Sequence, residues 1–207
     1  MPTSSNKTSR GKLRYGVLMA LAVLAACGQT AEEPLDDLAA QDIFQRGERQ
    51  IAQGNPDDAA FTFGEIERLY PYSEFASRAL IMQAFAFHRD EDYPNSRAAA
   101  QRYLDFYPAE QDAAYAAYLV ALSYYDQIDE IGRDQWLTSQ ALLALRRGIE
   151  QYPDSSYAAS SVEKFDLAFD YLAAKEMEIG RFYLKRGNYV AAANRFRTVV
   201  EDFQTTT

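Results

Sequence analysis

Residues 47–71, GERQIAQGNPDDAAFTFGEIERLYP, decide the fold of this 207-residue chain. Two amphipathic runs with helical spacing meet at Gly54-Asn55, a pair of residues typical of a helix end and turn. Gly47 and Ala59 place one small residue in each run, so that two helix backbones can approach closely. The aromatic Phe63 is expected to fill the groove beside that crossing. The stretch therefore predicts a closely packed helix–turn–helix pair.

The same arrangement returns along the chain. Tyr70-Pro71, Tyr107-Pro108 and Tyr152-Pro153 each close an amphipathic run, and proline cannot continue a helix. A 34-residue tetratricopeptide repeat has small residues at positions 8 and 20, an aromatic residue at 24 and proline at 32. With Pro71 at position 32, the first unit matches this pattern.

The other units can be aligned in the same way. The residues at positions 8 and 20 are Ala84 and Ser96, then Ala121 and Ala141, then Gly180 and Ala192. Position 24 of the last unit is Phe196, and Gly187-Asn188 falls at its turn. The prediction is an all-α tetratricopeptide-repeat solenoid of about four helix–turn–helix units over residues 38–207.

Irregular spacing locates two insertions. Successive position-32 sites lie 37, 45 and 51 residues apart, which is 3, 11 and 17 more than the standard unit. The 11 extra residues fit an enlarged loop at 126–136, and the 17 fit a long helix from about 157 to 186. A further turn is expected near Tyr93-Pro94.

The N-terminus has the form of a lipoprotein signal. A basic region precedes the twelve-residue apolar run 15–26, which is too short to span a membrane. The run ends in Leu24-Ala25-Ala26-Cys27, which resembles the bacterial lipobox. Residues 1–26 are therefore predicted to be a signal peptide, with acyl chains such as palmitate on Cys27 and a flexible tether over 27–37. An ordinary cleaved signal with an incidental cysteine is the alternative.

The net charge of the chain limits the classes of partner that it can bind. Removing the four bases of residues 1–26 leaves 17 Lys and Arg against 30 Asp and Glu, a formal charge of −13. Such a surface repels nucleic acid and gives no electrostatic attraction to anionic lipid, so membrane attachment depends on the anchor. Gly28 follows Cys27 in place of an inner-membrane retention Asp, which favours the outer membrane, facing the periplasm.

Catalytic chemistry has few candidate residues. His88 is the single histidine, and Cys27 is the single cysteine. The acidic residues 90–92 and 126–134 lack the alternating spacing of a calcium loop and are interpreted as solvated turns. We expect no enzyme activity, no cofactor and no metal. Trp136, the single tryptophan, is either a core residue or a partner anchor.

Binding is expected on the concave side, where positions 2, 5, 9, 12 and 13 of the first helices face. Aromatic residues mixed with arginine there suit an extended peptide or a terminal carboxylate. The candidates for a substrate-peptide groove are Phe44, Arg78, Phe85, His88, Arg89, Tyr118 and Tyr125. Tyr115 and Asp126 occupy further positions of this kind. The alternative is that several of these side chains only pack against the neighbouring unit.

The joints carry a family resemblance. Residues 70–76 (YPYSEFA) and 152–158 (YPDSSYA), together with the lipobox and the stretch from Phe182 to Asn194-Arg195, resemble the BamD family of outer membrane protein assembly factors. The resemblance implies a non-enzymatic lipoprotein subunit of the β-barrel assembly machinery. It would bind the POTRA region of BamA, other lipoproteins of the complex, and unfolded outer-membrane proteins for folding and insertion. Asn194 and Arg195 are the implied BamA contact.

The resemblance also leaves alternatives open. The family has a fifth repeat, and here Thr205 to Thr207 follow the fourth unit directly. Further chain or a partner is expected to cover that end. A periplasmic repeat scaffold of the TolA-binding, envelope-division type shares the YP-x-S-x-[YF]-A joints, but it would normally have an ordinary signal and a coiled coil. A lipoprotein partner of a peptidoglycan enzyme is the third class.

Overall fold

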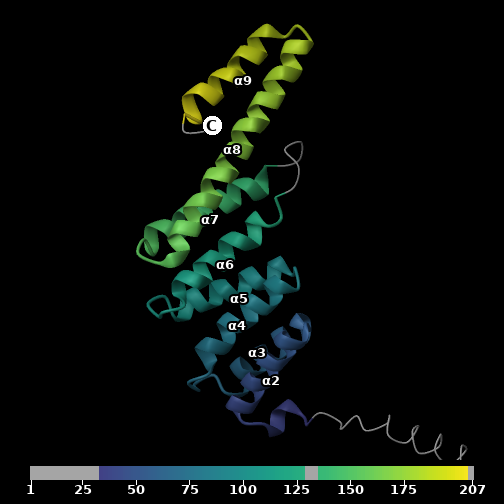
Figure 1. The fold of residues 1–207 in the computed structure, drawn as a ribbon, viewed down its shortest axis with the longest axis vertical. Helices are drawn as coiled ribbons and strands as arrows, with labels where there is room; N and C mark the ends of the chain where they lie inside the picture. Colours follow the sequence, from purple (N-terminus) through teal and green to yellow (C-terminus); the bar gives the residue numbers. More distant parts are fainter. Residues whose placement is uncertain (1–32, 129–134, 205–207) are drawn as a thin grey trace, which may run out of the picture. The chain divides into compact units, whose positions relative to one another are not determined.

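A computed structural model describes residues 33–128 and 135–204, and in these ranges all regular structure is helical (Figure 1). The elements are the 3₁₀ helix η1 (Leu35–Asp37) and the α-helices α2 (Ala40–Gln53), α3 (Pro56–Leu69), α4 (Ala76–Arg89), α5 (Tyr93–Phe106), α6 (Ala113–Tyr125), α7 (Trp136–Gln151), α8 (Ser156–Lys185) and α9 (Tyr189–Asp202). Contacts divide the chain into two units, Met1–Asp37 and Leu38–Thr207. The signal sequence and Cys27 lie outside the described residues.

The helices of the second unit follow one another as packed neighbours. α2 packs on α3, α4 on α5, α6 on α7 and α8 on α9, and each pair also contacts the next (Figure 1). This is the repeated helix–turn–helix arrangement that the spacing predicts, so the all-α tetratricopeptide-repeat fold is confirmed.

The turns of the outer units depend on glycine. Gly54 (φ 82°) and Gly187 (φ 76°) lie in the left-handed region, which a residue without Cβ adopts at little cost. The Asn55 N–H donates to the Gln50 carbonyl at 2.9 Å, and the Asn188 N–H donates to the Tyr183 carbonyl at 3.0 Å. These bonds satisfy carbonyls at the helix ends. Both predicted turns are therefore confirmed.

The helix crossings confirm the repeat register. All eight residues at positions 8 and 20 are buried, including Ala59 and Ala192. A Cβ atom on Gly47 would lie 2.7 Å from ring carbons of Phe63, and one on Gly180 would overlap the ring of Phe196. The glycine in the first helix thus makes room for the aromatic residue in the second. In the second unit Ser96 Oγ instead donates to the Ala84 carbonyl at 2.9 Å.

Both insertions lie where the spacing puts them. α6 ends at Tyr125 and α7 begins at Trp136, which are the bounds expected for the predicted loop at 126–136, and residues 129–134 of that loop lie outside the described residues. α8 runs for 30 residues, and Ser155 Oγ caps it by accepting from the Ala158 N–H at 3.1 Å. Along its length α8 packs on α6, α7 and α9 (Figure 1).

The turn expected near Tyr93-Pro94 lies directly before these two residues. Tyr93-Pro94 begin α5 instead of forming the turn, because proline is tolerated in the first turn of a helix. The chain reverses at residues 90–92, where Glu91 adopts φ 62°. Asp92 then caps α5 by accepting a hydrogen bond from the Asn95 N–H at 3.2 Å.

Replacing Gly47 by Ala tests the crossing. The added Cβ overlaps the buried Phe63 ring, so the variant should lose about 1–3 kcal/mol of unfolding free energy. Gly148 in α7 is the matched control, since its nearest neighbour to a new Cβ is Ala117 Cβ at 3.8 Å. Gly148→Ala should gain about 0.5–1 kcal/mol from helix propensity. Urea unfolding of both variants measures the difference, and a change of the same sign in both would contradict the assigned crossing.

Candidate partner-binding surfaces

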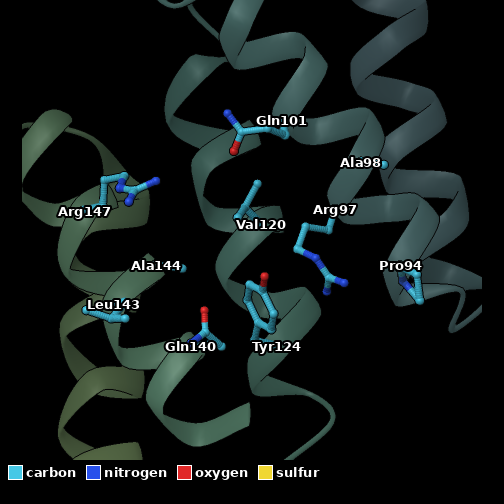
Figure 2. Close-up of a pocket in the computed structure, with 10 residues that line it drawn as sticks. All are labelled: Pro94, Arg97, Ala98, Gln101, Val120, Tyr124, Gln140, Leu143, Ala144 and Arg147. Carbon is cyan, nitrogen blue, oxygen red and sulfur yellow. The ribbon is translucent and has the colours of Figure 1, made fainter. Parts of the chain in front are cut away.

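The repeats present two sides. The first helices lie next to one another, since α4 contacts α6 and α6 contacts α8. We call the side chains that these helices carry along that row the first-helix face. On the second-helix side, a hollow of about 520 Å³ lies among α5, α6 and α7 (Figure 2).

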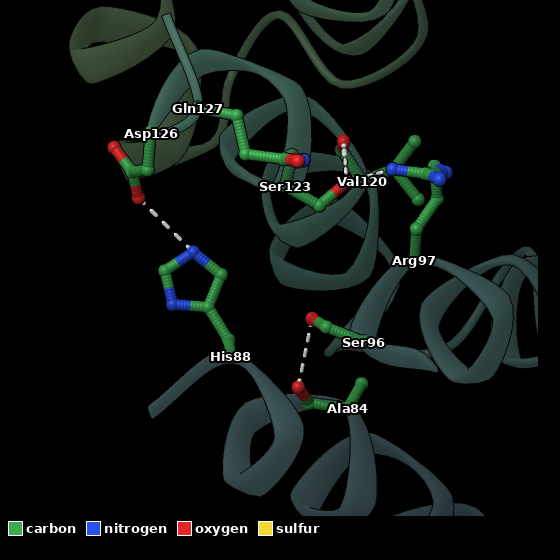
Figure 3. Close-up of polar contacts among 8 residues, drawn as sticks. All are labelled: Ala84, His88, Ser96, Arg97, Val120, Ser123, Asp126 and Gln127. Carbon is green, nitrogen blue, oxygen red and sulfur yellow. Dashed lines mark hydrogen bonds and ion pairs between the residues drawn. The ribbon is translucent and has the colours of Figure 1, made fainter. Parts of the chain in front are cut away.

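A short polar contact connects α4 to the end of α6 on the first-helix face. His88 Nε2 lies 3.0 Å from Asp126 Oδ2 (Figure 3). The His88 ring also packs edge-on against Tyr93, with 5.4 Å between the ring centroids. Asp126 lies in the exposed turn that follows α6, as its interpretation as part of a solvated turn predicts, and from there it also contacts His88. The repeat register could have indicated this contact, because His88 occupies position 12 of the second unit and Asp126 occupies position 13 of the third.

Aromatic rings connect α6 to α8. Tyr157 lies 5.1 Å from Tyr115 and 5.5 Å from Tyr118 between ring centroids, and these three residues form the tyrosine cluster. Lys164 Nζ lies 4.6 Å from the centre of the Tyr125 ring, a cation–π contact. Tyr157 belongs to the second YP-x-S-x-[YF]-A joint, but its position opposite α6 was not predicted.

Burial changes the acidity of these phenols. The pKa of Tyr115 is raised to about 12, chiefly by burial and in addition by the neighbouring Tyr157, Tyr118 and Asp112. Burial is also the largest cause of the raised pKa of Tyr118 and of Tyr125. All three phenols therefore remain neutral hydrogen-bond donors at physiological pH.

The N-terminal part of the face is less open than expected. Phe44 is only 3% exposed and packs against Phe63 and Phe75 at centroid distances of 5.3 and 5.6 Å. The Arg78 guanidinium covers it at 4.7 Å from the ring centre. Phe44 thus lies beneath Arg78, whereas Arg78 itself is exposed.

The next pair of an aromatic residue and an arginine, Phe85 and Arg89, is more accessible to solvent. Phe85 is half-buried, and the exposed Arg89 lies with its guanidinium 5.9 Å from the centre of the Phe85 ring. Arg78 and Arg89 therefore both lie on aromatic rings and keep nitrogen donors at the surface. A side chain that binds a carboxylate of a partner needs such accessible donors.

The two residues implied as a BamA contact lie in different hollows of the α8–α9 pair. Arg195 Nη1 donates to both carboxylate oxygens of Glu176 in α8, at 3.1 and 3.0 Å, and lines a hollow of about 390 Å³. Asn194 lines a separate hollow of about 560 Å³ beside Gly187. Arg195 is 44% exposed despite its ion pair.

Other features bear on function. Trp136 is 55% exposed and contacts Tyr124 edge-on at 6.0 Å, so it is not a core residue, and its role as a partner anchor stays a prediction. In the part of the chain that the structure describes, no cluster of His, Cys, Asp and Glu is arranged to hold a metal ion. Nor does any described helix have the length and apolar character needed to cross a membrane.

Comparison with known proteins gives a consistent match. Residues 36–207 match the model of the YfiO family, described as "Outer membrane lipoprotein". Two relatives named "Outer membrane protein assembly factor BamD" are 36% identical over 200 residues (Caulobacter vibrioides) and 35% over 197 residues (Rickettsia prowazekii). They cover 95% and 94% of this chain, which spans 66% and 78% of their own lengths.

A solved structure is also similar. MamA residues 41–end from Desulfovibrio magneticus RS-1 matches 94% of this chain and 91% of that one, with a TM-score of 0.44 and 16% identity. This likeness is too distant to assign a function.

The raised pKa of Tyr115 has a consequence for stability. In the unfolded chain a tyrosine ionises near pH 10, whereas Tyr115 stays protonated in the folded chain until about pH 12. Its contribution to the unfolding free energy is therefore complete below pH 10 and is lost between about pH 10 and 12. Tyr115→Phe should flatten the fall of unfolding free energy over that interval. Tyr72, which is fully exposed, is the control, and a Tyr72→Phe variant with the same flattening would contradict the assignment.

Proposed function

The chain belongs to the YfiO/BamD family of outer membrane lipoproteins, and from this membership we propose that it is a non-enzymatic subunit of the machinery that folds and inserts outer-membrane β-barrels. In this role it binds the POTRA region of BamA and unfolded outer-membrane proteins, alongside other lipoproteins of the complex. The family match over residues 36–207 is the observation that carries the proposal. Isolation of the chain from membranes should co-purify BamA, and absence of BamA would contradict it.

The first-helix face supports a role in substrate binding. Strands of outer-membrane barrels alternate apolar and polar residues, so an extended segment presents aromatic side chains at every second position. The neutral phenols of Tyr118 and Tyr125 offer apolar rings with a polar edge, and Arg78 and Arg89 offer donors to a carboxylate. His88, paired with Asp126, contributes by joining α4 to α6.

The α8–α9 pair supports BamA binding. Several large apolar side chains are exposed here, among them Phe182, Val190 and Val200, with Val190 77% accessible. Exposed apolar residues around an arginine are typical of protein interfaces. Asn194 and Arg195 therefore belong to one proposed interface, although they line separate hollows.

The TolA-binding alternative gains no support from the joint that the two families share. Its shared feature is the YP-x-S-x-[YF]-A joint, which serves a structural purpose here: the Tyr152 hydroxyl donates to the Pro108 carbonyl at 3.1 Å and connects successive units. Because the joint is explained by packing, it does not distinguish the two functions.

Lipidation of Cys27 is the proposed means of attachment to the outer membrane, on the periplasmic side. The chain is acidic, and diacyl anchors hold stably where one chain does not. Cys27→Ser should move the protein from the membrane pellet to the soluble fraction, because no second cysteine can accept the lipid. Immunoblots of separated fractions measure this. A variant that still sediments with outer membranes would contradict the anchor.

Arg195→Ala should weaken BamA binding by about tenfold while costing at most about 1 kcal/mol of stability, as expected for loss of an exposed ion pair. Arg195→Lys should have a smaller effect, because Lys keeps the charge but cannot reproduce bidentate geometry. Affinity for purified BamA POTRA domains and urea unfolding measure the two quantities. Arg197→Ala, a change at another exposed arginine of α9, is the matched control.

Glu176→Gln separates the two roles of Arg195. It removes the intramolecular ion pair but retains the guanidinium, so BamA affinity should be kept or increased. An equal loss of affinity in Glu176→Gln and Arg195→Ala would show that the ion pair only supports the fold. Unchanged affinity in Arg195→Ala would remove that residue from the interface.

A further inference from the structure

We propose that the hollow on the second-helix side binds an acidic, extended segment of another protein, at a site separate from the first-helix face. We call this hollow the second-helix groove. It has a volume of about 520 Å³, within the range of ligand-binding clefts. The residues that carry the argument are Arg97, Gln101, Val120, Tyr124, Leu143 and Arg147. The proposal does not depend on BamA binding.

Three helices build the groove. Val120 and Tyr124 of α6 lie between Arg97 of α5 and Arg147 of α7, so an apolar floor has a guanidinium on each side (Figure 2). Leu143 of α7 extends the apolar surface and is largely exposed. A ligand here would bury apolar area in the middle and place polar groups at both edges.

The charge of the groove is opposite to that of the chain. The protein carries a formal charge of −9, yet the groove is lined by two arginines and by no Asp or Glu. Positive charge concentrated on an acidic protein selects a short anionic ligand, because a long polyanion would meet the surrounding negative surface.

The donors of the two arginines are not used by carboxylates. Arg97 donates to Ser123 Oγ at 3.3 Å and lies 4.3 Å from the centre of the Tyr124 ring, contacts that hold it in place without neutralising it. Among the residues that the structure describes, Arg147 forms no ion pair and no hydrogen bond. Two guanidiniums therefore remain available to bind carboxylates in the bidentate manner.

An extended peptide fits this chemistry better than a small anion. The apolar floor requires an apolar side chain, and the guanidiniums require carboxylates near it. In an extended chain, alternate side chains point the same way, so glutamates two residues before and after a leucine share its face. The amide of Gln101, whose Nε2 donates to Asp105 Oδ1 at 2.9 Å, keeps its carbonyl oxygen for a peptide N–H.

Fluorescence anisotropy with a labelled peptide tests the proposal. The probe is Gly-Ser-Glu-Ser-Leu-Ser-Glu-Ser-Gly with both termini blocked, so that only side-chain carboxylates are present, and the protein is the full chain in detergent. The glutamate peptide should bind, and the same peptide with Gln in place of Glu should bind about tenfold more weakly. Added salt should weaken binding of the glutamate peptide.

Two substitutions locate the site. Arg147→Gln should weaken binding by about tenfold, because it removes a guanidinium that could hold a ligand carboxylate and that has no polar partner among the described residues. Arg146→Gln is the matched control, since it removes the same charge from the adjacent residue, whose guanidinium lies 5.5 Å from the centre of the Phe165 ring. It should change binding by less than about twofold. Thermal unfolding of both variants checks that the fold is retained.

Several results would overturn the proposal. Equal binding of the Gln and Glu peptides would mean that carboxylates are not recognised. Equal losses in Arg146→Gln and Arg147→Gln would indicate general electrostatic attraction and no groove. If phosphatidylglycerol vesicles bound the chain in an Arg147-dependent manner and the peptide did not, the groove would be a lipid site.

Discussion

The close approach of two helix backbones within each repeat is the constraint on which the rest of the structure depends. At both ends of the array a glycine in the first helix accepts the ring of an aromatic residue in the second, Gly47 with Phe63 and Gly180 with Phe196. The middle units have alanine and serine at positions 8 and 20, and all of these residues are buried. A larger side chain at any of these positions would displace a helix, and because each repeat packs only on its neighbours, the next interface would move with it.

The position of the helix crossing determines which way the other side chains of each helix point. First helices that contact their counterparts bring position 12 of one unit beside position 13 of the next, which places His88 against Asp126. The same row brings Tyr157 of α8 against Tyr115 of α6. The opposite side of α6 carries Val120 and Tyr124 into the second-helix groove. One helix thus contributes to two surfaces, and the two surfaces share no side chain.

More of the fold than of the side-chain contacts could be predicted from the sequence. Small residues, turns and prolines act locally, so the helix pairs and the 30-residue α8 could be inferred from spacing. The contacts depend on how elements meet. Phe44 is buried because Phe75 of the following joint packs on it, and the repeat spacing alone does not predict that contact. Arg195 meets Glu176 across a turn, 19 residues earlier in the chain. Arg147 faces a groove formed by three helices, and a search limited to first-helix positions could not find it.

The arginines show how an acidic repeat protein distinguishes its partners. Arg78 and Arg89 lie on aromatic rings, Arg195 is paired with a carboxylate, and Arg147 has no polar partner among the described residues. A guanidinium held by an aromatic ring keeps its donors, whereas one held by Glu176 must exchange that carboxylate for the partner's. The free energy gained by binding through Arg195 is therefore only the difference between two similar ion pairs. Such a contact contributes more to geometric selectivity than to affinity. Binding through Arg147 replaces water alone, so a short acidic segment gains the full strength of a charge-assisted hydrogen bond there.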